Sequence, residues 1–91
     1  MIVTLDEMKN YLRVDYDDDD ALITHLLESA EQTCMDVARE SDADTFESLP
    51  NARIAVLYAA AYLYEHREEA DHNKMLLTLR ALLFGSRKEA F

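Results

Sequence analysis

Residues 52–64 read A-R-I-A-V-L-Y-A-A-A-Y-L-Y, and this stretch decides the fold. Its one charged side chain is Arg53, so a helix built from it has almost no polar face and belongs inside a protein, with other helices around it. The stretch is rich in Ala and lacks Gly and Pro, which favours helix over strand. It is too short for a bilayer, which takes about 20 apolar residues. The sequence therefore predicts a buried central helix from Ala52 to about Glu69.

The residues around this stretch predict what surrounds it. Pro50 fits a first helical turn, where a missing N–H is tolerated, so Ser48 or Leu49 is the expected cap. From Ile54 to Tyr64 the helix should be covered on all sides by three amphipathic helices. Their expected bounds follow from apolar residues at helical spacing: Leu5–Leu12, Ala21–Ala38 and Lys74–Phe84.

Local signals refine these helices. Thr4 and Glu7 form a capping box for the first one, and Asp19 or Asp20 is the expected cap of the second. Asn73 or Asp71 is the expected cap of the last one. A single helical turn around 44–47 is compatible with the polar segment before Pro50, and Phe46 should pack back onto the core.

Length and composition bound the fold class. A chain of 91 residues with one Gly and one Pro holds one domain and lacks the turn residues of an all-β fold. We expect an all-α domain over residues 1–91, a small bundle of four helices around the buried Ala-rich helix, with 85–91 as a flexible tail. Cys34 is the only cysteine, so no internal disulfide forms, and its place on the apolar stripe predicts a buried thiol. The N-terminus lacks the features of a signal peptide, so a product of the cytoplasm is expected.

The formal charge of −10 is unevenly distributed. Residues 1–73 carry −13, whereas residues 74–91 carry +3. A whole protein of this charge is a poor duplex binder, because neutralising phosphates requires Lys and Arg. Solubility alone explains much of the charge. A functional interpretation is a partner that meets the two oppositely charged ends.

The acidic run at 17–20 admits three interpretations. An EF-hand loop starting at Asp17 fails, since its fifth and sixth positions are Ala21 and Leu22, where an oxygen ligand and a Gly belong. A helix cap with a solvated loop fits best, and a weak cation site and a functional acidic patch remain as alternatives.

Catalytic patterns are missing from the sequence. The three histidines, His25, His66 and His72, form no HExxH motif, the single cysteine gives no zinc pair, and the single glycine gives no phosphate loop. We therefore expect no enzyme activity, no metal and no cofactor.

Three blocks of the sequence together resemble the tailed-phage head–tail connector (adaptor) family, whose members are often labelled as DNA-packaging proteins. The first block is L-D-E-M-K-N-Y-L-R-V-D at 5–15, followed by the acidic run and a long helix. The second is Pro50, the Ala-rich helix and Y-L-Y-E-H-R-E at 62–68. The third is 79–87, where Leu82-Leu83 precede a short basic end. The resemblance covers most of the chain, although Gly85-Ser86 stand where relatives often have a Pro-Tyr-Arg-like sequence.

The resemblance implies a non-enzymatic structural protein at the head–tail junction of a virion, made in the cytoplasm of a bacterial host. Such a protein would form a homo-oligomeric ring of about a dozen copies beneath the portal protein. The ring would extend the DNA channel, let DNA pass without sequence-specific binding, and carry a tail completion or stopper protein. No membrane is involved.

Site residues follow from charge and position under this interpretation. The candidate channel-lining acids are Asp17, Asp18, Asp19, Asp20, Glu68 and Glu69. The candidate residues for docking on the portal or on a neighbouring subunit are Leu83, Phe84, Arg87, Lys88 and Phe91. The competing hypothesis is an acidic DNA mimic that inhibits a nuclease or another DNA-binding protein. A non-viral helical scaffold domain is a third alternative.

Overall fold

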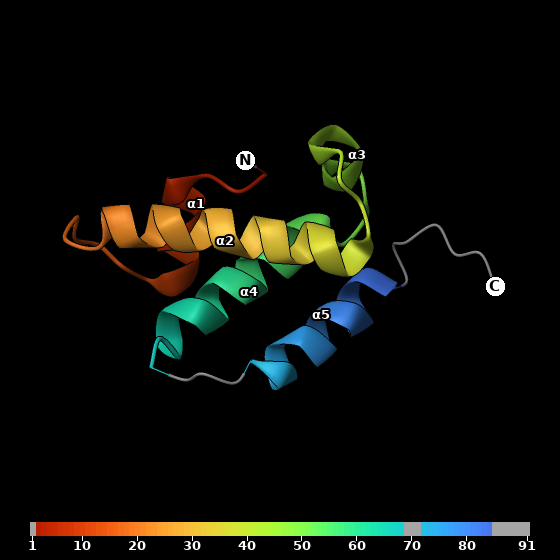
Figure 1. Ribbon diagram of the computed structural model, residues 1–91. Helices are drawn as coiled ribbons and strands as arrows, with labels where there is room; N and C mark the ends of the chain where they lie inside the picture. The colour runs from red at the N-terminus through yellow and green to blue at the C-terminus, as the bar shows by residue number, and fades with distance from the viewer. Residues whose placement is uncertain (1, 69–71, 85–91) are drawn as a thin grey trace.

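The computed structural model describes residues 2–68 and 72–84, and these fold into helices with no strand among them. Figure 1 shows α2 lying across the molecule, with α1, α4 and α5 packed on it. The all-α prediction is confirmed, and the turn before Pro50 is a short helix of its own. The helices are α1 (Leu5–Leu12), α2 (Asp20–Ala38), α3 (Ala43–Glu47), α4 (Ala52–Glu65) and α5 (Asn73–Phe84).

The central helix is α4, and most of its buried side chains are alanines. Ala52, Ala55, Val56, Ala59 and Ala60 are all 0–1% exposed. Because alanines leave little side chain between two backbones, α2 can run closely along α4, and these two helices share the most extensive packing in the molecule. Apolar burial of this kind is the main favourable term in folding.

Three details of α4 differ from the prediction. The helix ends at Glu65 rather than near Glu69, since the backbone of His66 (φ −121°, ψ 42°) leaves helical values. Its N-cap is Asn51, so Pro50 lies one residue before the cap rather than in the first turn. Ile54 is 56% exposed, which means that the helices do not cover α4 on all sides.

The start of α1 follows its local signal. Thr4 and Glu7 form the expected capping box, with each side chain accepting the other residue's backbone N–H at 3.0–3.1 Å. Helices α1 and α2 both end on an arginine with positive φ, Arg13 after α1 and Arg39 after α2. Glycine usually takes this left-handed capping conformation, and a side chain there costs some backbone strain.

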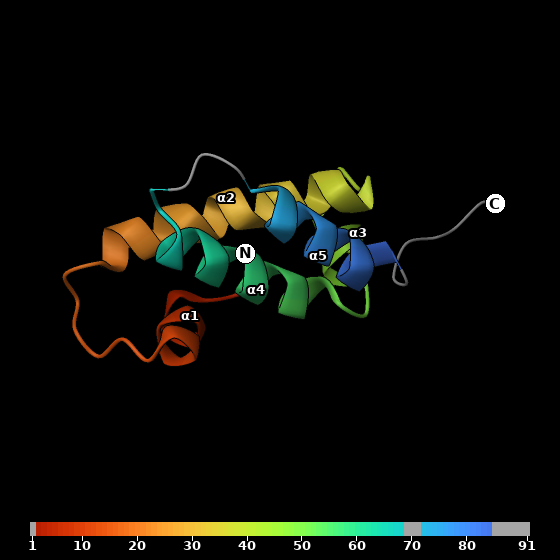
Figure 2. The same ribbon diagram turned by 90° about the horizontal axis from the view of Figure 1, so that it is seen from below.

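The remaining core side chains come from α2, α3 and α5. Phe46 of α3 is fully buried, as expected, and so are Leu79 and Leu83 of α5. The Asn51 side-chain amide donates to the Leu82 carbonyl at 2.9 Å, which links the start of α4 to the end of α5. Figure 2, turned by 90°, shows α1 and α5 on different sides of α4, and these two helices make no contact with each other.

Cys34 of α2 lies in this core with no exposed surface, as predicted. Burial, with a smaller contribution from the negative charge of Glu31, raises the pKa of its thiol to about 12. Since the thiolate is the reactive form, this thiol is inert in the folded protein. None of the described helices combines the length and apolar character that crossing a membrane requires.

Candidate functional site: an acidic end of the molecule

The acidic run lies in the connection between α1 and α2, and Lys9 of α1 holds it. The Lys9 ammonium is 2.8 Å from an Asp17 carboxylate oxygen and 2.7 Å from one of Asp20. Only 13% of the Lys9 side chain is exposed, whereas Asp17 is 86% exposed. Hydrogen bonds to Asp17 and then Asp20 raise the pKa of Lys9, and the bond to Lys9 lowers the pKa of Asp17.

A second contact ties this loop to α4. The Tyr64 hydroxyl donates to an Asp19 carboxylate oxygen at 2.7 Å. The hydrogen bond to Asp19 is the largest cause of a raised Tyr64 pKa, and a hydrogen bond to Tyr16 is the second. Asp19 occupies the N-cap position of α2, yet its side chain makes no capping hydrogen bond. The cap expected from the sequence is therefore replaced by a tertiary contact.

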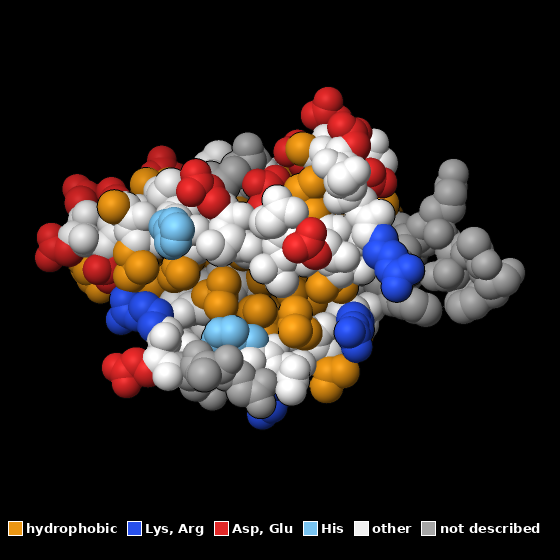
Figure 3. Space-filling view, in the orientation of Figure 1, with side chains coloured by type: hydrophobic (Ala, Val, Ile, Leu, Met, Phe, Trp, Pro, Cys, Tyr) orange, Lys and Arg blue, Asp and Glu red, His pale blue; other side chains and the backbone are white. Residues whose placement is uncertain are grey.

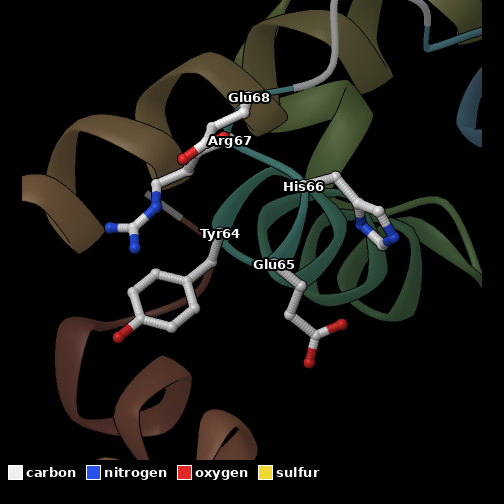
Figure 4. Close-up of a pocket in the computed structure, with 5 residues that line it drawn as sticks. All are labelled: Tyr64, Glu65, His66, Arg67 and Glu68. Atoms are coloured by element: carbon white, nitrogen blue, oxygen red, sulfur yellow. The ribbon is translucent and has the colours of Figure 1, made fainter.

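The C-terminal end of α4 turns sharply beside this contact. Tyr62 and His66 stack with ring centres 4.1 Å apart, and the His66 Nδ1 lies 3.0 Å from the Tyr62 carbonyl oxygen. The Arg67 guanidinium lies over the Tyr64 ring at 5.1 Å. Figure 4 shows Tyr64 and Arg67 on one side of the helix end and His66 on the other. Glu68 is exposed at this turn.

Two acidic segments that are far apart in the sequence thus lie together. The bond between Tyr64 and Asp19 brings the end of α4 to the start of α2. In Figure 3 several carboxylates lie at the left end of the molecule, and others lie over α2 and α3. We call this surface the acidic end. It consists of Asp15, Asp17, Asp18, Asp19 and Asp20 of the connection and Glu68 after α4, with the Arg67 guanidinium beside them over the Tyr64 ring.

The predicted channel-lining acids have different surroundings within the acidic end. Asp17, Asp19 and Asp20 are held by Lys9 or Tyr64. Asp18 and Glu68 are exposed. Glu69 lies outside the described residues.

The predicted docking residues fall at and beyond the end of α5. Leu83 is fully buried in the core and offers no surface to a partner. Phe84 ends α5, but its side chain, together with Arg87, Lys88 and Phe91, lies outside the described residues. The part of α5 that is exposed includes Lys74, Leu77 and Arg80.

The acidic end has a shallow depression at the turn after α4. The depression at the turn is lined by the consecutive residues 64–68, so it is the hollow of a turn rather than a cleft between elements. Among residues 2–68 and 72–84, no three His, Cys, Asp or Glu side chains are arranged to hold a metal ion. What the site offers is a group of carboxylates, three of which are held in place by Lys9 and Tyr64.

Lys9 and Tyr64 are the two positioning residues that the sequence analysis missed. Lys9 is the first cation in the chain, on a helix that directly precedes the acidic run. That isolated position was a usable signal for an ion pair. Tyr64 carried no such signal, because its distance from Asp19 depends on how α4 crosses α2.

Comparison with known proteins identifies one family. The family described as "Phage gp6-like head-tail connector protein" matches residues 2–85. The match includes all the described helices. The curated proteins and the solved structures give no match.

Proposed function

Because this chain belongs to the phage gp6-like head-tail connector family, we propose that it forms a ring between the portal and the tail. Membership makes it a structural, non-enzymatic component of a phage virion, with partners among the proteins that join head and tail. The family match over residues 2–85 is the observation that carries the proposal.

The uneven charge of the chain supports the proposed ring. Residues 1–73 carry −13 and residues 74–91 carry +3, so different surfaces of one subunit attract each other in two copies. A contact between two different surfaces is heterologous, and it repeats from copy to copy until the rotation closes. We propose closure at about a dozen subunits.

We further propose that the acidic end faces the DNA channel. Carboxylates repel phosphates over a range of about 8–10 Å at physiological ionic strength, so DNA passes without being held. Lys9 and Tyr64 support this role, since they keep three of the carboxylates in fixed positions. Asp18 and Glu68, both exposed, would meet the DNA, with Glu69 following them in the chain.

The basic end of the chain is the proposed contact with the portal. Arg87 and Lys88 supply positive charge there, and Phe84 and Phe91 supply apolar surface. A tail completion or stopper protein would occupy the opposite side of the ring.

Electron microscopy of the protein mixed with its cognate portal tests this function. The expected result is an additional ring of density on the portal, coaxial with its channel. The portal alone and the portal of an unrelated phage serve as controls. Absence of added density on the cognate portal, at concentrations well above those of the virion components, would overturn the proposal.

The alternative of an acidic DNA mimic has less support. A mimic presents carboxylates to its target at phosphate-like spacing, whereas here Asp17, Asp19 and Asp20 are engaged by Lys9 and Tyr64 within the chain. A pull-down separates the two hypotheses: recovery of the portal supports the connector, and recovery of a host nuclease supports the mimic.

A further inference from the structure

Apart from Tyr16 (51% exposed) in the connection between α1 and α2, the large apolar side chains that are more than half exposed lie on two separate surfaces of the packed helices. Tyr11 of α1 (53% exposed) and Ile54 of α4 (56%) lie on one, and Leu77 of α5 (63%) lies on the other. A single exposed apolar residue is ordinary on a protein surface. What surrounds Tyr11, Ile54 and Leu77 is what marks their positions as contact surfaces.

The first surface is a hollow between α1 and α4. It is lined by Glu7, Asn10, Tyr11, Arg53 and Leu57. Leu57 is 9% exposed, so an apolar side chain reaches the hollow from the core. Ile54 lies one turn before Leu57 and therefore on the same side of α4.

Two acidic residues of α1 and one arginine of α4 lie at or next to this hollow. Glu7 lines it and pairs with Arg53, which is the only charged side chain of α4 before its last residue. Asp6 precedes Glu7 in α1 and is exposed. The Arg53 charge is thus already matched by Glu7, which leaves the negative charge of Asp6 beside the hollow.

The second surface is the outer side of α5, where Leu77 stands between two cations. Lys74, Leu77 and Arg80 are spaced three residues apart, and all three are exposed. Residues at this spacing lie on one side of a helix. The opposite side of α5 faces the core through Met75, Leu79 and Leu83.

These two surfaces cannot meet within one chain. Both α1 and α5 pack on α2 and α4, but they make no contact with each other. Figures 1 and 2 show them on different sides of α4. Surfaces that are complementary in charge yet separated in one molecule can pair only between two molecules, and such a contact is heterologous.

We propose that Leu77 of one copy inserts into the hollow between α1 and α4 of a second copy. Lys74 and Arg80 then face Asp6 and Glu7, and the Leu77 side chain covers Tyr11, Ile54 and Leu57. Charge selects a second copy as the occupant, because the two acids of α1 outnumber Arg53 at the hollow, whereas α5 carries two cations and no acid. The inference rests on the proposed ring and names the surfaces that build it.

Cross-linking of two single-cysteine variants tests the contact directly. Full-length Tyr11→Cys and Leu77→Cys are mixed and treated with a short bismaleimide, both at high concentration and on the cognate portal. The native Cys34 thiol is buried and does not compete. We expect a covalent dimer in the mixture and much less with either variant alone, and a ladder of multimers from the double variant.

A matched control replaces Tyr11→Cys by His25→Cys, which places a thiol on the exposed surface of α2. This variant should give no product with Leu77→Cys. Independently, Leu77→Glu should weaken self-association about 10- to 100-fold, the effect of losing the burial of a Leu side chain. His25→Glu adds the same charge and should leave self-association unchanged.

Two outcomes overturn the contact. One is a product from Leu77→Cys alone that equals the product of the mixture, which indicates a two-fold contact. The other is the lack of any product between Tyr11→Cys and Leu77→Cys under both conditions. If microscopy still shows a ring on the portal, the proposed function stands and only the assigned surfaces fail. If cross-links form but no ring appears on the portal, the contact stands and the connector assembly fails.

Discussion

Lys9 is the residue on which the order of the acidic end depends. Its ammonium contacts two carboxylates that are three residues apart, Asp17 and Asp20. The Asp20 amide also donates to the Asp17 carbonyl at 3.2 Å, so the ion pairs and the backbone fix the same turn. A surface ion pair alone contributes little to stability. Here one cation serves two carboxylates in a loop of like charges, and its removal leaves their repulsion unopposed.

Lys9→Met removes the charge and keeps the length of the side chain. We expect faster amide hydrogen exchange across residues 17–20, with the helical circular dichroism unchanged. Lys74→Met, which removes an equal charge from α5, should leave exchange in the loop as it is. Equal exchange rates in Lys9→Met and the unmodified protein would contradict the anchoring role.

The contribution of the Lys9–Asp17 ion pair to the free energy of unfolding depends on pH, and the sign of the dependence is defined for each partner. The folded-state pKa of Asp17 is lowered, so its share of stability is present above the ordinary carboxyl value of about 4 and is lost as pH falls through the lowered pKa. The folded-state pKa of Lys9 is raised, so its share is present below about 10.4 and is lost as pH rises through the raised pKa. The urea midpoints of the unmodified protein and Lys9→Met should therefore differ most between those limits and converge in acid.

At the scale of the element, α3 depends on one side chain. It has five residues, and its Asp42 N-cap accepts from the Thr45 amide at 3.0 Å. A helix this short is unstable in isolation, because nucleation is unfavourable and few hydrogen bonds follow. The buried Phe46 ring is what holds it against α2 and α4.

Phe46→Ala should therefore lower the free energy of unfolding by about 3–5 kcal/mol, the usual cost of truncating a buried aromatic side chain. Urea denaturation measures the change. Asp44→Ala in the same helix is the matched control, since Asp44 is exposed and such substitutions usually change stability by less than about 0.5 kcal/mol. A loss of under about 1 kcal/mol for Phe46→Ala would mean that α3 is dispensable for the core.

At the scale of the whole molecule, the fold brings two acidic segments to one end. The connection between α1 and α2 meets the end of α4 through Tyr64 and Asp19. The basic outer side of α5 belongs to a helix that does not contact α1. This separation of charge is what a subunit needs if one surface is to face DNA and another is to face a neighbour.

Reversing the two exposed charges tests the channel position. In a phage that carries Asp18→Lys and Glu68→Lys, we expect DNA to be retained during ejection and the plaque titre to fall, because the new lysines attract the phosphates that the carboxylates repelled. Ejection is followed by DNA release from purified virions. Glu28→Lys, on the exposed side of α2, serves as the control and should leave ejection normal. Normal ejection in the double variant would place the acidic end away from the channel.

The sequence by itself determined the elements of this protein. The Ala-rich stretch at 52–64 predicts the buried helix, and Thr4 with Glu7 predicts the start of α1, because both signals are local and depend on residues within one or two turns. Cys34 and Phe46 were likewise predicted as buried, and the three resembling blocks gave the family that the match over residues 2–85 confirms.

Only the tertiary structure decided how those elements meet. Helical periodicity predicts which side of a helix is apolar, but not the angle at which two helices cross. Ile54 is exposed, Leu83 is buried, and Asp19 is bound to Tyr64, 45 residues away, instead of capping its own helix. A capping hydrogen bond from Asp19 and its hydrogen bond with Tyr64 are similar in strength. The packing of α2 against α4 places Tyr64 within reach of Asp19 and so determines which bond forms.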